Sequence, residues 1–350
     1  MVADIVNPHD FASTSGICGG RKSLIFREKN GMRALRVAAP NAAPAFAEIP
    51  QPRPGPNEVL IDVAACGLNF ADLLLARGTY QERQAFPLTL GMEVAGTVAE
   101  CGAQVGGFLP GDRVAAFTGS GGLAPRCIAP ASRLLRVPDA MPFDAAAAFP
   151  VAYGTSHLAL TVRAGLCAGE TVVVLGAGGG VGLTAVEIAA TLGARVIAVA
   201  RGAEKQAATR AAGAVETLDS DADDLRARLK ALGGVDVVYD TVGDPLAGEA
   251  LRACRPGARY LAIGFAGGEV PAFRLNYLLV KNITAHGIYW GGYAAFDPAT
   301  LTDSLACLLD WYRAGRLRPH VGHHLPFERA ADGLEMLRAR RAAGKIVIMR

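Results

Sequence analysis

The chain has 350 residues, a length that favours two domains, and 51% of them are hydrophobic, which is enough for large cores. Its formal net charge is +3 and no run of basic residues stands out, so the charge pattern gives no indication of a nucleic-acid surface. Since no apolar stretch reaches about 18 residues without a charge or a turn signal, we expect no membrane span.

The cysteines and the N-terminal segment indicate where the protein resides. Seven cysteines are dispersed along the chain without a C-x-x-C pair, which argues against a disulfide framework and favours a reducing compartment. The opening segment MVADIVNPHDFASTSG has neither the basic nor the apolar region of an export signal. We therefore expect a cytoplasmic protein.

The first part of the chain predicts a mainly β module. Residues 1–31 are polar and rich in turn formers, so we expect a flexible extension there. From 32 to 152, short apolar segments are separated by Gly and Pro, and the Pro-rich stretch 50–56 predicts a stiff connector. The clearest predicted strands are 33–37, 58–65, 94–101 and 113–117.

The pattern changes near residue 153 to alternating strands and helices, which predicts an α/β fold with a doubly wound parallel sheet over 153–291. The tail, 298–350, carries two helical patterns and a closing strand at 345–349, and we expect it to pack back on the first module. The predicted strands are 172–175, 195–199, 215–218, 235–239, 259–263 and 283–288, and predicted helices include 221–232 and 244–253.

A glycine-rich turn at 176–182 follows the first of these strands and leads into an apolar helix. This layout is typical of a site for a dinucleotide pyrophosphate, because glycines let the backbone approach the phosphates and the helix N-terminus offers free N–H groups. A glycine turn alone is a weak signal, but the flanking strands and helix strengthen it. The predicted cofactor contacts in the turn are Ala177, Gly179, Gly180 and Val181.

The carboxyl ends of parallel strands line the ligand crevice in such a sheet. Small residues follow three of the predicted strands here, and they leave room for a ribose and a nicotinamide. The alternative interpretation is that these segments are only connecting loops. The residues predicted to contact the cofactor at these ends are Thr241, Gly264, Phe265 and Trp290.

The end of the second strand indicates which dinucleotide fits. Sites that prefer NAD place an acidic residue there to bind the ribose 2′-hydroxyl. This chain has Ala200 instead, followed by Arg201 and Lys205, whose charges suit a 2′-phosphate. We therefore predict NADPH as the cofactor, with the alternative that both cations are ordinary solvated surface charges.

Six motifs occur along the chain: GLNFADLLLARGTY (67–80), GMEVAGTVAECG (91–102), PGDRV (110–114), GAGGGVG (176–182), VDVVYDTVG (235–243) and GKIVIM (344–349). Together they resemble the medium-chain dehydrogenase/reductase superfamily, and within it the zinc-free quinone oxidoreductase branch, the zeta-crystallin-like enzymes. The resemblance implies a GroES-like β module at 32–152, completed by 292–350, with a Rossmann domain at 153–291 between them.

The resemblance also bears on zinc. Zinc-dependent relatives carry a cysteine where this chain has Asn69 and a histidine where it has Met92, and neither side chain is a plausible zinc ligand. The region of the structural zinc lobe offers only Cys101 and Cys127 of the four cysteines required. We therefore expect no metal, which argues against alcohol oxidation and favours reduction of an electron-poor substrate.

By the same resemblance, Asn69 and its partner Asp72 lie near the nicotinamide, Tyr80 lines the cleft, and Thr155 contacts the nicotinamide side of the cofactor. Some relatives have a further tyrosine at the position of Leu74, so the chain departs from a strict quinone-reductase pattern. Tyr80 is the best available acid, although water is an alternative proton source.

Other polar residues have two interpretations each. Glu93 is either a proton-relay group or a buried, paired carboxylate, and His157 is either close to the cofactor or packed in the core. His323 and His324 are expected to be solvated or capping residues rather than metal ligands, because no acidic or cysteine ligand follows at suitable spacing.

The sequence thus predicts an NADPH-dependent oxidoreductase that reduces quinones or α,β-unsaturated carbonyls, with a small electrophilic molecule as substrate. One alternative is an enoyl-thioester (acyl-CoA) reductase, suggested by Leu74 and the apolar run 73–76. Another is an NADPH-binding protein with a structural or regulatory role. We also expect a homodimer, formed by pairing of sheet edges near 283–288.

Overall fold

The computed structural model describes residues 31–350, which form one compact unit. The predicted extension, apart from Gly31, lies outside the described residues. Gly31 itself opens the first strand, one residue before the predicted start of the β module. In the described part of the chain, no helix is both long enough and apolar enough to cross a bilayer.

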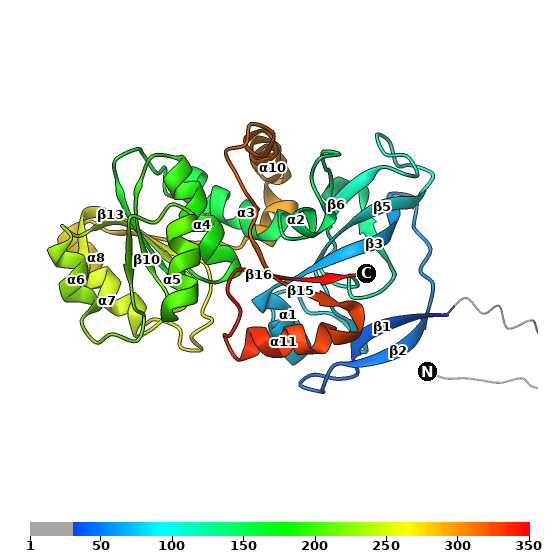
Figure 1. Cartoon of the computed structure of the whole chain (residues 1–350), viewed down its shortest axis with the longest axis horizontal. Coiled ribbons are helices and arrows are strands. Elements are labelled where there is room, and N and C mark those ends of the chain that lie inside the picture. Colours follow the sequence, from blue (N-terminus) through cyan, green and yellow to red (C-terminus); the bar gives the residue numbers. More distant parts are fainter. Residues whose placement is uncertain (1–30) are drawn as a thin grey trace, which may run out of the picture. The chain divides into compact units, whose positions relative to one another are not determined.

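A seven-stranded sheet forms the basis of the β module (Figure 1). Its path is β15-β16-β3-β5-β6-β8, and β7 pairs with β3 beside this path. A second sheet of three strands has the order β2-β1-β4. The strands are β1 (Gly31–Val37), β2 (Ala45–Pro50), β3 (Glu58–Leu68), β4 (Leu88–Thr89), β5 (Glu93–Cys101), β6 (Arg113–Phe117), β7 (Arg126–Pro130), β8 (Leu134–Arg136), β15 (Val321–Pro326) and β16 (Lys345–Met349).

The C-terminal end of the chain completes the seven-stranded sheet. The closing strand β16 runs antiparallel to β3, with Ile346 opposite Leu68, and lies between β3 and β15 (Figure 1). The sequence did not predict β15, whose residues VGHHLP alternate between half-buried and exposed. A short edge strand with two histidines lacks the continuous apolar run that marks a buried strand.

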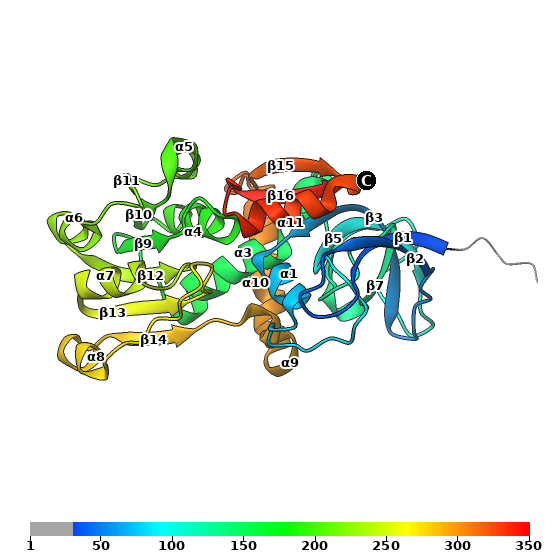
Figure 2. The same cartoon turned by 90° about the horizontal axis from the view of Figure 1, so that it is seen from below.

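The six-stranded sheet is parallel and has the order β11-β10-β9-β12-β13-β14, which Figure 2 shows from one edge to the other. All six predicted strands are present, and the order is that of a Rossmann fold, so the predicted fold class is confirmed. The strands are β9 (Thr171–Leu175), β10 (Arg195–Val199), β11 (Glu216–Leu218), β12 (Val235–Asp240), β13 (Cys254–Ala262) and β14 (Thr284–Gly287).

Helices cover this sheet and connect it to the β module. Buried residues of α4 belong to a core that also includes the β module, whereas α6 and α7 pack on the opposite face of the sheet. The predicted helix at 221–232 is shorter in the structure and begins at Leu225. The helices are α1 (Phe70–Arg77), α2 (Phe143–Ala147), α3 (Pro150–His157), α4 (Gly180–Thr191), α5 (Gly202–Ala211), α6 (Leu225–Ala231), α7 (Leu246–Ala253), α8 (Leu275–Lys281), α9 (Tyr293–Phe296), α10 (Pro298–Arg313) and α11 (Ala330–Arg338).

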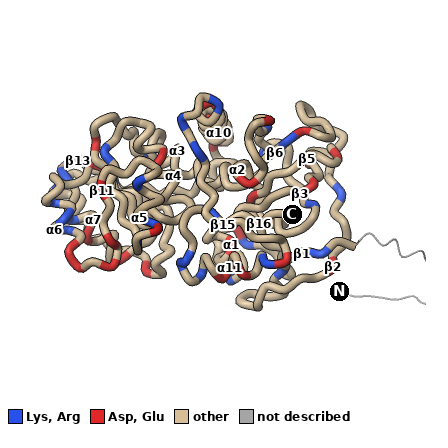
Figure 3. The backbone as a smooth tube through the Cα atoms, in the orientation of Figure 1, with Lys and Arg blue, Asp and Glu red and all other residues tan. Residues whose placement is uncertain are grey.

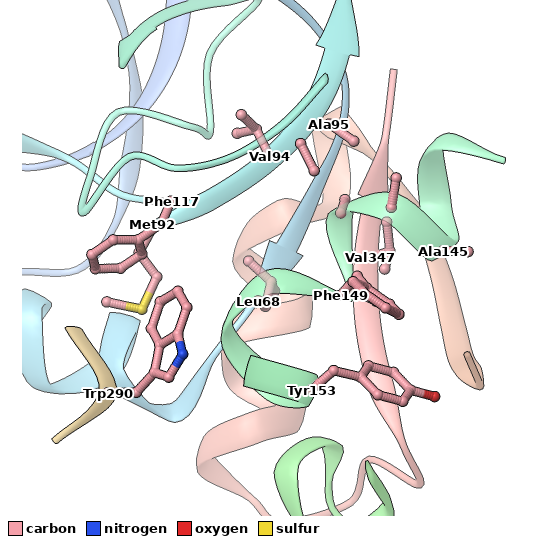
Figure 4. Packing of buried hydrophobic residues seen from close by; sticks show 14 of the residues in the cluster. Leu68, Met92, Val94, Ala95, Phe117, Ala145, Phe149, Tyr153, Trp290 and Val347 are labelled. Carbon is pink, nitrogen blue, oxygen red and sulfur yellow. The ribbon is translucent and has the colours of Figure 1, made fainter. Parts of the chain in front are cut away.

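One hydrophobic core runs through both halves. Figure 4 shows part of it, where Met92 and Phe117 of the β module meet Trp290, which follows the last strand of the parallel sheet. Because these buried contacts continue from one sheet to the other, side chains from both halves have defined positions at their junction. Basic and acidic residues are interspersed in both halves (Figure 3).

Candidate cofactor and substrate site

The glycine turn has the close backbone packing that a phosphate cradle requires. Gly176 has a φ of +73°, and a Cβ atom on it would lie 2.4 Å from the Thr241 hydroxyl oxygen. A Cβ on Gly182 would lie 2.2 Å from the Gly176 carbonyl oxygen, so only glycine allows α4 to start this close to the turn. The Thr241 hydroxyl donates to the Leu175 carbonyl at 2.8 Å and joins the first and fourth strand ends.

The N-terminus of α4 follows directly. Its N-cap residue is Gly179 and no side chain caps the first turn, which suits the binding of an anion at this helix N-terminus. Ala177 is buried and its N–H bonds the Val199 carbonyl at 3.0 Å. The Val181 carbonyl accepts from the Ser156 hydroxyl at 3.1 Å, which ties α3 to α4. The four residues predicted in the turn thus lie together at one helix N-terminus.

Lys205 lies against this turn. A Cβ on Gly178 would be 2.5 Å from Lys205 Cβ, and the Lys205 ammonium donates to the Arg340 carbonyl at 2.7 Å. Partial burial, together with the charge of Arg201, lowers the pKa of Lys205. Ala200 is buried at the end of β10. Lys205 therefore packs beside the glycine turn.

Arg201 has a different environment. Its side chain is exposed and forms an ion pair with Asp221, with a separation of 3.0 Å. An exposed pair of this kind contributes little stability, since solvent screens it. Of the two predicted cations, only Lys205 is packed against the glycine turn.

Arg340 is a cation that the sequence analysis missed. It has a left-handed backbone with a φ of +53°. Its guanidinium donates to the Gly267 carbonyl at 2.7 Å, and its own carbonyl accepts from Lys205. The basic stretch 338–341 was visible in the sequence, but 135 residues separate Arg340 from Lys205 and no local pattern relates them.

The ends of β12 and β13 meet as predicted from the parallel sheet. The Ala266 N–H donates to the Thr241 carbonyl at 3.0 Å, and the Gly264 N–H donates to the Asp240 carbonyl at 3.2 Å. Phe265, between these two residues, is half-buried. Thr241, Gly264 and Phe265 are therefore one group beside the glycine turn.

Thr155 and Trp290 come together at the junction of the halves. Thr155 is buried on α3, and a Cβ on its neighbour Gly154 would lie 2.5 Å from Trp290 Nε1. Trp290 is 4% exposed and its ring meets Phe117 edge-on, with 5.2 Å between centroids (Figure 4). Within residues 31–350, its buried indole N–H has no hydrogen-bond partner. Such a donor marks a place where a ligand group or a water would be accommodated.

Asn69 belongs to a buried network with a lysine that the sequence analysis did not single out. The Asn69 amide donates to Glu93 Oε1 at 2.8 Å and accepts from the Lys345 ammonium at 2.9 Å. Lys345 also bonds Glu93 directly, and the two side chains are 4% and 0% exposed. A Cβ on Gly180 would lie 2.7 Å from Lys345 Cδ, so the lysine stem borders the N-terminus of α4.

This network decides between the two interpretations of Glu93, a proton-relay group or a paired carboxylate. Glu93 Oε2 accepts from the Val151 N–H at 3.0 Å, so both oxygens of Glu93 have protein partners. Glu93 is a buried, paired carboxylate, the second of its two predicted interpretations. The signal for Lys345 was present in the sequence as a single lysine at the start of an apolar strand.

Asp72 supports the backbone at this place. It is fully buried, and its two oxygens accept from the N–H groups of Asn69 at 2.9 Å and Gly91 at 3.0 Å. Burial raises the pKa of Asp72 to about 6, and the two backbone hydrogen bonds oppose the increase. Asp72 therefore contacts the segment that carries Asn69, and both of its oxygens are engaged there.

Tyr80 is the third predicted catalytic residue. It is half-buried between α1 and β4, and its ring meets Tyr289 edge-on, with 6.2 Å between centroids. Burial raises the pKa of Tyr80, so its hydroxyl is protonated at neutral pH and can donate a hydrogen bond. Of the three predicted catalytic side chains, Tyr80 offers this donor, whereas Asn69 and Asp72 are engaged in the buried network.

His157, His323 and His324 each have a protein partner of their own. His157 is buried, with its Nδ1 2.8 Å from the Ser304 hydroxyl, which agrees with the packed interpretation. On β15, His324 pairs with Asp144 at 2.8 Å, and His323 accepts from the Ala343 N–H at 3.2 Å. The described residues contain no group of three or more His, Cys, Asp or Glu side chains arranged for a metal.

Two family models match the two halves of the chain. Residues 55–139 match the alcohol dehydrogenase GroES-like domain, and residues 180–307 match the family described as zinc-binding dehydrogenase. At the positions discussed for zinc, however, Asn69 is held by Glu93 and Lys345, and Met92 is buried against apolar neighbours (Figure 4).

Whole-chain similarities agree with these matches. Quinone oxidoreductase-like protein 2 of Bos taurus is 38% identical over 310 residues, which cover 87% of this chain and 89% of the relative. The acryloyl-coenzyme A reductase of Sulfurisphaera tokodaii is 27% identical and covers 91% of this chain and 99% of its own. The quinone oxidoreductase of Thermus thermophilus, solved alone and with NADPH, superposes with a TM-score of 0.80 at 34% identity, over 91% of this chain and 100% of that one.

Proposed function

Because the chain belongs to the quinone oxidoreductase branch of the medium-chain dehydrogenase/reductase superfamily, we propose that it is an NADPH-dependent reductase of quinones or α,β-unsaturated carbonyls. The observation that carries the cofactor assignment is the position of Lys205 against the glycine turn, next to a β10 end that has Ala200 in place of an acid. A cation at this position attracts a 2′-phosphate, whereas the acid of an NAD site would repel it.

The described residues fit this cofactor. A Cβ at Gly176 or Gly182 would collide with neighbouring atoms, so the turn is closely packed there, and the N-terminus of α4 would hold the pyrophosphate. Lys205, packed against Gly178, would hold the 2′-phosphate. The orphan indole donor of Trp290 and the side chain of Thr155 would border the nicotinamide.

When bound, NADPH supplies the hydride for the reduction. The protein positions the acceptor and stabilises the negative charge that develops on its oxygen, and we assign this hydrogen bond to Tyr80. We propose that no zinc takes part, because Asn69 is tied to Glu93 and Lys345 and Met92 is packed in the core. The proton comes from the Tyr80 hydroxyl or from water.

A panel of acceptors tests the proposal. Purified protein treated with a chelator is mixed with NADPH and with a quinone, an enone or an enoyl thioester, and NADPH oxidation is followed by stopped flow. We expect turnover with quinones or enones, and a kcat about 10- to 100-fold lower in Tyr80→Phe, since one donor to the developing oxyanion is lost. The matched control is Tyr312→Phe, which should retain the kcat.

The other outcomes are informative. Turnover with enoyl thioesters alone would favour the alternative reductase, the activity named for the Sulfurisphaera tokodaii relative. Tight NADPH binding without turnover of any acceptor would favour a structural or regulatory role and contradict the proposed reaction.

We further propose that two copies of the chain form a homodimer through β14. Within residues 31–350, this strand is an edge of the six-stranded sheet and pairs only with β13. Beside it, α8 exposes large apolar side chains, among them Leu279 at 77% and Val280 at 78%. An unpaired strand edge next to exposed apolar residues suits pairing with a second copy.

Size-exclusion chromatography with light scattering measures this directly. We expect the mass of two chains for the wild type and of one chain for the double variant Leu279→Glu, Val280→Glu, because the charges would be buried unpaired in the interface. Leu109→Glu is the matched control, since Leu109 is 71% exposed in the β module, and it should remain dimeric. A monomeric wild type or a dimeric double variant would contradict the proposal.

A further inference from the structure

A tyrosine–carboxylate pair joins the two halves beside Tyr80. Tyr289 follows β14 of the parallel sheet, whereas Glu82 belongs to the segment between α1 and β4 of the β module. The Tyr289 hydroxyl donates to Glu82 Oε1 at 2.6 Å, across a sequence separation of 207 residues. Neither side chain has a role in the cofactor site described above.

Two glycines define the orientation of Tyr289. A Cβ on Gly292 would lie 2.7 Å from Tyr289 Cδ1, and a Cβ on Gly291 would lie 3.5 Å from the Tyr289 hydroxyl oxygen. The ring therefore lies directly on the backbone of this diglycine. Its hydroxyl reaches Glu82 from a position that the local fold determines.

The same ring contacts Tyr80, with the edge-on geometry described above. The segment that carries Tyr80 has a second anchor within its own half, where the Ser120 hydroxyl donates to Gln84 Oε1 at 2.9 Å. Burial and the hydrogen bond to Glu82 raise the pKa of Tyr289, so this hydroxyl remains a donor at neutral pH. The bond to Glu82 and the ring contact with Tyr80 thus both connect the Tyr80 segment to the cofactor-binding half.

We propose that Tyr289 and Glu82 are positioning residues that hold the Tyr80 hydroxyl at a fixed place relative to the nicotinamide side of the cleft. The hydrogen bond restrains the segment 79–87, and the edge-on ring contact restrains Tyr80 itself. The proposal rests on the proposed reductase function for its effect on turnover. The restraint on the segment exists whether or not an acceptor is reduced.

Amide hydrogen exchange of the full chain tests the restraint without turnover. Tyr289→Phe keeps the ring and removes the donor, and we expect exchange in 79–87 to become about fivefold faster, the equivalent of one hydrogen bond. Glu82→Gln retains an acceptor oxygen, so its exchange in 79–87 should remain close to that of the wild type. Glu82→Ala lacks the acceptor, and its exchange there should be as fast as in Tyr289→Phe.

The matched control is Tyr153→Phe, which removes a bond of the same type, from the Tyr153 hydroxyl to Glu187 Oε2 at 2.5 Å, at another place in the fold. It should leave the exchange of 79–87 unchanged. Unchanged exchange in Tyr289→Phe, or an equal increase in Tyr153→Phe, would overturn the proposal.

Kinetics test the positioning role. We expect Tyr289→Phe to lower kcat about fivefold, with the KM for NADPH unchanged, and to cause no further loss when Tyr80→Phe is already present. If the losses of kcat in Tyr289→Phe and Tyr80→Phe were additive in the double variant, Tyr289 would not act through Tyr80. If the wild type reduces no acceptor while Tyr289→Phe still increases exchange, the proposed function fails and the restraint is retained.

Discussion

Replacement of Lys345 by methionine is expected to lower the free energy of unfolding by about 3–5 kcal/mol, the usual effect of removing one partner of a buried ion pair. Glu93 would remain fully buried as a charged carboxylate with only neutral donors, from Asn69 and the Val151 N–H. Urea unfolding at neutral pH measures the change. Its physical cause is the desolvation of an unpaired charge, since methionine fills a similar volume.

A second variant isolates that cause. The double variant Lys345→Met, Glu93→Gln removes both charges and should recover a large part of the lost stability. Arg338→Met is the matched control, because its ion pair with Glu335 is exposed and should contribute about 0–1 kcal/mol. If the double variant were as unstable as Lys345→Met alone, the unpaired carboxylate would not be the cause.

Replacement of Lys205 by alanine is expected to weaken NADPH binding about 10- to 100-fold and to leave NADH binding nearly unchanged. The reason is the loss of a charge-assisted hydrogen bond to the 2′-phosphate, worth about 1.5–3 kcal/mol. Isothermal titration with both nucleotides measures the difference. Lys205 lies against Gly178 and is partly buried, so solvent screens it less than the exposed Arg201.

Two further variants sharpen this test. Arg201→Ala should have a smaller effect on NADPH binding, because Arg201 is exposed and already paired with Asp221. Arg210→Ala is the matched control on the same helix, where the side chain bonds Thr217, and it should bind both nucleotides as the wild type does. An equal loss of NADPH and NADH affinity in Lys205→Ala would exclude the 2′-phosphate role.

The elements predicted best are those whose signal is local. Strands of the parallel sheet are buried on both faces, and they are therefore continuous apolar runs that the sequence displays directly, as at 172–175. Strand β15 was missed because its histidines at an edge interrupt that signal. The group of Thr241, Gly264 and Phe265 was anticipated because parallel strands must end at the same edge.

The residues that the sequence did not reveal are those whose role depends on a partner far away in the sequence. Lys345 is 276 residues from Asn69, and Arg340 is 135 residues from Lys205. The same holds for Glu82 and Tyr289, which are 207 residues apart, because no local sequence pattern marks either position. That Asn69 lies near the nicotinamide stays a prediction, and the structure shows its amide engaged by Glu93 and Lys345.

By itself the sequence determined the α/β class, the six parallel strands and the glycine turn, because burial and tight turns leave periodic or compositional marks within a few residues. The tertiary structure alone decided which buried charges are compensated and which hydrogen-bond donors are already engaged. Buried ions and hydrogen-bond donors are satisfied by whichever groups the fold brings within about 3 Å, and sequence distance does not restrict that choice.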